Sequence, residues 1–112
     1  MEVHAEREGG ILITRAEGRV DGTNAREFEE ALHAVIGEDD RLLIMDLQDL
    51  SYISSAGLRA FLMIAKKLQS RGGKLVVCSL TDTINEVFEI SGFSRIIPTH
   101  ASRSEAVAKH GG

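Results

Sequence analysis

One segment in the middle of the chain reads Asp46-Leu-Gln-Asp-Leu-Ser-Tyr-Ile-Ser-Ser-Ala-Gly-Leu58. The residues just before it, 42–45, are all apolar, which is typical of a strand buried on both faces of a sheet. The residues after it place apolar side chains at helical spacing. We therefore expect a buried strand that ends near Leu47, a short loop, and a helix that begins at Ser54 or Ser55, since serine is a favoured N-cap residue.

The chain before this segment predicts a hairpin followed by a helix. Two strands, at about 3–6 and 11–16, flank a Gly-Gly pair that suits a tight turn. After a turn at Asp21-Gly22, Asn24 and Glu27 have the spacing of a capping box, which predicts the start of an amphipathic helix that ends near Gly37.

The chain after this segment alternates between helix and strand signals. Helices are expected at about 55–70, 83–91 and 103–109, and the last of these opens with the capping-box pair Ser102 and Glu105. Strands are expected at 75–78 and at 96–97, with Pro98 near the end of the last strand. The prediction is an α/β fold over one domain, residues 1–112: a mixed central sheet with an N-terminal hairpin, then alternating strands and helices, with about four helices.

Composition excludes several classes of function. Seventeen acidic against thirteen basic residues give a net charge of -4, which disfavours direct nucleic-acid binding. No apolar run approaches the roughly 20 residues of a membrane-spanning helix, and residues 1–7 lack the apolar core of a signal peptide. The lone Cys78 favours a reducing compartment. We expect a cytoplasmic protein without membrane insertion, cofactor or metal, since no cluster has metal-ligand spacing.

Ser54 and Ser55 carry the most specific chemical signal. Either serine can simply cap the helix. The start of a helix also suits a phosphate, because free amides and the positive end of the helix dipole lie there. A phosphoserine would add roughly -1.5 to -2 charges without melting the helix, and it would therefore act on partners rather than on the fold.

The helix that follows has two apolar faces. The side expected to pack on the sheet consists of Leu58, Phe61, Leu62, Ala65 and Leu68. The opposite side is expected to carry Ala56, Ala60, Met63 and Lys67, with Arg59 beside them. Small and adaptable side chains next to Ser55 suit a partner surface, although alanine and methionine are also simply good helix formers.

A catalytic interpretation is less well supported. Ser55-Ala56-Gly57 is similar to half of a nucleophile elbow, but Ile53 stands where the motif has glycine, and hydrolases of that fold are far longer. No histidine is placed by the sequence to serve Ser55, as a catalytic serine requires. We therefore predict a protein that is not an enzyme, with a minimal serine hydrolase as the rival from another class.

The ordered motifs resemble the STAS domain of bacterial anti-sigma factor antagonists. The resemblance rests on segments spread over nearly the whole chain: 18–21 (Gly-Arg-Val-Asp), 46–47, 50–58, 72–78 and 87–93. It implies a STAS fold. It also implies that the unphosphorylated protein binds a serine-kinase anti-sigma factor and thereby releases the sigma factor, that the kinase ends binding by phosphorylating a serine, and that a PP2C-type phosphatase reverses the modification.

Counted back from Gly57, the phosphoacceptor that the resemblance implies is Ser55. Ser54 replaces the family's usual aspartate and is a possible second acceptor. The implied partner-binding residues are Asp21, Ser54, Ala56, Gly57, Arg59, Ala60 and Met63. The alternative within the same fold is a STAS subunit of a lipid-transporting ABC system, or of a stress-signalling assembly, that binds its partner without phosphorylation.

Overall fold

The computed structural model describes residues 3–111. In chain order its elements are β1 (Val3–Glu8), β2 (Ile11–Ala16), β3 (Gly18–Val20), α1 (Ala25–Val35), β4 (Leu42–Asp46), β5 (Leu50–Ile53), α2 (Ser55–Gln69), β6 (Lys74–Cys78), α3 (Asp82–Ser91), η1 (Phe93–Arg95), β7 (Thr99–His100) and α4 (Arg103–His110). The central sheet has the order β1-β2-β4-β6-β7. β1 and β2 form the predicted antiparallel hairpin, and the other pairings are parallel. The predicted mixed α/β fold is therefore confirmed.

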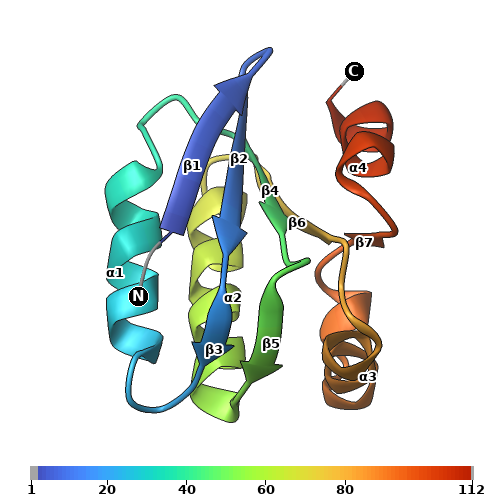
Figure 1. Cartoon of the computed structure of the whole chain (residues 1–112). Coiled ribbons are helices and arrows are strands. Elements are labelled where there is room, and N and C mark those ends of the chain that lie inside the picture. Colours follow the sequence, from blue (N-terminus) through green and yellow to red (C-terminus); the bar gives the residue numbers. More distant parts are fainter. Residues whose placement is uncertain (1–2, 112) are drawn as a thin grey trace.

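The central sheet carries apolar side chains on both faces. One face packs against α1 and α2, which lie side by side, and Phe28 of α1 stacks on Phe61 of α2 with ring centroids 5.4 Å apart. α4 covers the other face through Ala106 and Val107 (Figure 1). Burial on both sides explains why the central strands are continuously apolar in sequence.

A second, two-stranded sheet, which the sequence did not predict, extends the fold toward the start of α2. β3 and β5 pair in parallel, with Val20 opposite Ile53. Both strands are short, and each mixes exposed and buried residues, so neither shows the alternation that identifies a strand. This small sheet ends where α2 begins, and it therefore sets the position of Ser54 and Ser55.

Two local predictions are wrong. Residues 96–97 do not form a strand: the amides of Ile96 and Ile97 both bond to the carbonyl of Phe93, and the last strand follows Pro98 instead of containing it. Asn24 does not form a capping box, because its side chain accepts a hydrogen bond from the Asp21 amide and donates one to a β3 carbonyl. The capping residue Ser102 behaves as predicted, accepting from the amide three residues on.

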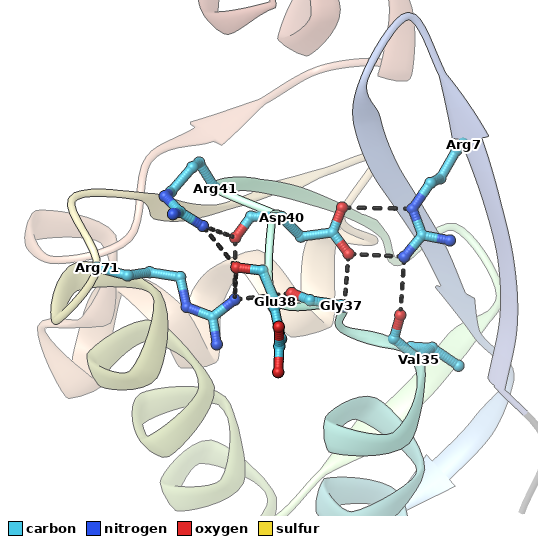
Figure 2. A network of polar contacts seen from close by, with 7 residues as sticks. All are labelled: Arg7, Val35, Gly37, Glu38, Asp40, Arg41 and Arg71. Atoms are coloured by element: carbon cyan, nitrogen blue, oxygen red, sulfur yellow. Dashed lines mark hydrogen bonds and ion pairs between the residues drawn. The ribbon is translucent and has the colours of Figure 1, made fainter.

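The loop between α1 and β4 is held by a polar network at the opposite end of α2 from the two serines (Figure 2). Asp40 is almost fully buried and accepts two hydrogen bonds from Arg7 of β1 and one from the Gly37 amide. Arg71, just beyond α2, donates to loop carbonyls, including that of Gly37 at 2.7 Å. The Arg7 hydrogen bonds are the main cause that lowers the pKa of the Asp40 carboxyl.

Candidate functional site at the start of α2

Ser54 and Ser55 have different structural roles. Ser54 is the N-cap: its backbone is extended, and its Oγ accepts a hydrogen bond from the Gly57 amide at 3.2 Å. Ser55 is the first helical residue, and its side chain is exposed. The first turn of α2 holds no acidic residue to complement the positive end of the helix dipole. The exposed Ser55 hydroxyl therefore lies at a position where added negative charge is favourable to the helix.

The first turn of α2 is fixed against the small sheet. The Ser54 amide donates to the Val20 carbonyl at 2.9 Å. Gly57 is buried, and a Cβ added there would lie 2.7 Å from Cγ1 of Ile53 and 2.9 Å from Cγ1 of Val20. Glycine is needed at this position because the helix approaches both strands too closely for any side chain. The direction of α2 as it leaves the sheet is thus set by packing.

The exposed side of α2 begins at Ser55 and differs from the predicted stripe. Ala56, Arg59 and Met63 are exposed as predicted, and Met63 retains 41% of its accessible surface. Ala60 was predicted to lie among them, but that placement is wrong: Ala60 is only 2% exposed, since this side of the helix packs against α1. Gly57, another predicted partner-binding residue, is likewise inside the fold.

A groove of about 470 Å³ runs between α1 and α2 beside this surface. The residues that line it are Gly22, Ala25, Arg26, Glu29, Glu30, Ala56, Arg59 and Ala60. The α1 side of the groove was not predicted, because the sequence does not reveal which face of α1 meets α2. Its lining combines glycine and alanine with charged side chains, an arrangement that suits a segment of a partner protein with both apolar and polar groups.

Asp21, also predicted to bind a partner, lies in the turn between β3 and α1. Its carboxylate accepts hydrogen bonds from the hydroxyl and the amide of Thr23, at 2.6 and 2.9 Å, and lies 3.8 Å from the guanidinium of Arg19. The hydrogen bonds from Thr23 are the largest cause that lowers the pKa of Asp21. The guanidinium of Arg19 also lies 4.2 Å from the ring centroid of Tyr52 on β5, so this turn and the small sheet form one charged surface.

Within residues 3–111, no histidine forms a hydrogen bond with Ser55. Each histidine contacts another group: His4 is near Glu17, His33 is near Glu29 and Lys67, and His100 bonds to His110. No group of three or more metal-ligating side chains occurs among the described residues. Among the same residues, no helix is both long and apolar enough to span a bilayer. The exposed side chains of Ser55, Ala56 and Arg59 are accessible to a partner protein.

Comparisons with known proteins identify the family of the chain. The STAS domain family matches residues 2–106 of the chain. The chain is 43% identical over 108 residues to BtrV of Bordetella bronchiseptica, which is described as a candidate anti-sigma factor antagonist; the match covers 96% of this chain and 93% of BtrV. It is 36% identical over 92 residues to the anti-sigma-B factor antagonist of Listeria monocytogenes, covering 82% of this chain and 81% of that protein.

Solved structures show the same fold at lower sequence identity. The anti-sigma factor antagonist SpoIIAA in its unphosphorylated form superposes with a TM-score of 0.80 at 19% identity, covering 96% of this chain and 95% of SpoIIAA. The Bacillus cell fate determinant SpoIIAA in its phosphorylated form gives a TM-score of 0.72 at 19% identity, covering 96% and 98%. At this level of identity the comparison establishes the fold alone.

Proposed function

Because the chain belongs to the STAS domain family, we propose that it is an anti-sigma factor antagonist controlled by phosphorylation of Ser55. The unphosphorylated protein binds a serine-kinase anti-sigma factor, so that the sigma factor is released. Phosphorylation ends this binding, and a PP2C-type phosphatase restores it. The names of the Bordetella and Listeria relatives support the role, and the solved phosphorylated and unphosphorylated forms of SpoIIAA support a phosphorylation switch.

This proposal rests on the different structural roles of Ser54 and Ser55. Ser54 supplies the cap, with its Oγ on the Gly57 amide, and Ser55 leaves its hydroxyl exposed one residue later. A phosphoryl group on Ser55 therefore keeps the cap and the helix. Ser54 is the poorer acceptor, because its half-buried oxygen already accepts a hydrogen bond.

The added charge acts on the partner surface around Ser55. Ala56 and Met63, which are both exposed, offer apolar contacts there. A dianion inside an interface costs several kcal/mol through desolvation and like-charge contacts. A cost near 3 kcal/mol weakens binding roughly a hundredfold, since about 1.4 kcal/mol corresponds to a factor of ten.

Intact-mass measurement of the protein from its native cells, with peptide mapping of residues 42–66, tests the modification. We expect a single phosphoryl group on Ser55. Protein that stays unmodified during growth, stress and starvation, and that the host's serine kinases fail to label, would contradict the switch.

Binding to the candidate kinase of the same cells tests the consequence. Ser55→Asp should abolish or greatly weaken the complex, and Ser55→Ala should preserve it. The matched control is Ser104→Asp, which adds the same charge to an exposed serine in the first turn of α4. Equal weakening by Ser55→Asp and Ser104→Asp would show a general charge effect and contradict the assigned site. Unchanged binding of Ser55→Asp would point to partner binding that phosphorylation does not control.

A further inference from the structure

The arginines of this chain are nearly all engaged. The sequence contains nine, and all lie within the described residues. Seven of them have a carboxylate or carbonyl partner in the structure: Arg7, Arg15, Arg19, Arg26, Arg41, Arg71 and Arg103. Within residues 3–111, only Arg59 and Arg95 have none. Arg59 lies one turn after the proposed phosphoacceptor, whereas Arg95 lies in η1.

The acidic residues beside Arg59 are already paired with other groups. Glu29 and Glu30 line the same groove from α1. The carboxylate of Glu29 lies 3.2 Å from His33, and that of Glu30 lies 3.4 Å from Arg26. Arg59 thus remains an exposed cation without a counter-ion, close to Ser55 along the helix.

We propose that Arg59 is the positioning residue for a phosphate on Ser55, and that its guanidinium pairs with the phosphoryl oxygens along α2. Residues four apart lie one above the other on a helix surface, so both side chains extend from the same face. A guanidinium can donate two parallel hydrogen bonds to a phosphate. The inference rests on the proposed function and depends on the side chain of Arg59, not on the amides of the helix start.

The pair makes phosphorylation change two features of the surface together. The phosphate adds negative charge at Ser55, and the pairing draws the guanidinium of Arg59 away from the groove between α1 and α2. A partner that docks there no longer contacts the guanidinium of Arg59 and meets the negatively charged phosphate instead. The guanidinium also favours the dianionic phosphate, and it therefore lowers the second pKa of the phosphoserine, which is ordinarily near 6.

A titration of the phosphate by ³¹P NMR tests the pair directly. Phosphoserine is installed at position 55 of the full chain during its synthesis, so that no kinase is needed. We expect the second pKa of the phosphate to be about 0.3 units or more higher in Arg59→Gln than in the unsubstituted phosphoprotein. Arg59→Lys should restore part of the difference, since lysine keeps the charge but lacks the planar fork.

The matched control is Arg95→Gln, which removes the other unpaired guanidinium far from Ser55 along the chain. It should leave the phosphate pKa unchanged. Equal pKa values in Arg59→Gln and the unsubstituted protein would overturn the pairing, and so would an equal shift in Arg95→Gln. Either result leaves the role of Ser55 intact, because that role is tested separately by peptide mapping of protein from native cells.

Discussion

Replacing Thr14 by valine is expected to stabilise the fold. Thr14 lies in the middle of β2, between β1 and β4, and is fully buried. Its neighbours two residues away, Leu12 and Ala16, belong to the core that faces the helices, so its side chain points the same way. The Thr14 hydroxyl has no hydrogen-bond partner within the described structure. Burying this hydroxyl therefore has a desolvation cost that is absent for valine, which has nearly the same shape.

The size of the effect follows from that unsatisfied group. A buried polar group without a partner costs about 1–3 kcal/mol. The entropy of unfolding is about 2.1 cal/mol/K per residue, which for 112 residues gives about 0.24 kcal/mol/K. Each kcal/mol gained then raises the melting temperature by about 4 °C. We expect Thr14→Val to raise it by about 4–12 °C, corresponding to a gain of roughly 1–3 kcal/mol.

Calorimetry and urea denaturation of the purified protein measure both quantities. Thr81→Val is the matched control, because the Thr81 hydroxyl caps α3 by accepting from the Ile84 amide at 3.3 Å. The same substitution there should cost about 1 kcal/mol. An unchanged or lower stability of Thr14→Val would refute the reasoning, since it would mean that the Thr14 hydroxyl makes a stabilising hydrogen bond in the folded protein.

Three further predictions concern single residues. Gly57→Ala should lose about 1 kcal/mol in urea denaturation, because overpacking exceeds the gain in helix propensity, and an unchanged midpoint would contradict the close approach. Asp40→Asn should lose about 1–2 kcal/mol at pH 7, because Asp40 pairs with Arg7. The loss should shrink below about pH 4, because the lowered pKa of folded Asp40 means that the unfolded unsubstituted chain takes up this proton first and is stabilised by it. Burial is the main cause that lowers the pKa of His110 below 6.5 in the folded protein, and His100, whose ring nitrogen lies 2.8 Å away, is the second. The unfolded chain therefore takes up this proton first, and stability should fall as pH drops below 6.5. In His110→Gln that fall should be smaller, and an identical pH profile of the melting temperature would count against the shift.

The parts of the fold that could be predicted are those with a strong periodic signal. The apolar run 42–45 and the helical spacing after Ser55 identified a buried strand and α2, and the structure confirms both. The short segments gave no such signal. β3 has three residues and β5 has four, so neither is long enough for alternation to be recognised. The pair Ile96-Ile97 has the composition of a strand, but the turn η1 continues into it.

The sequence predicted individual residues of the site, but it did not predict which of them are exposed on one surface. Ser54 and Ser55 could be placed at the helix start because serine is a common cap, and the cap is confirmed for Ser54. The exposure of Ala60 was predicted wrongly, because spacing shows which residues share a helix face and does not show how many faces are covered. α2 is covered on two sides, by the sheet and by α1, and that second contact depends on how the helices cross.

The packing around Ser55 restricts how a phosphate there can act. Gly57 leaves no room for movement toward β3 and β5, and the Ser54 amide is tied to the Val20 carbonyl. A conformational relay would need a second packing of the first turn, and these contacts disfavour one. The switch that we propose is therefore local: the change in charge on the exposed face acts directly on whatever protein contacts it. Such a mechanism needs no rearrangement of the core, because the switch depends on the difference in partner affinity between the two charge states.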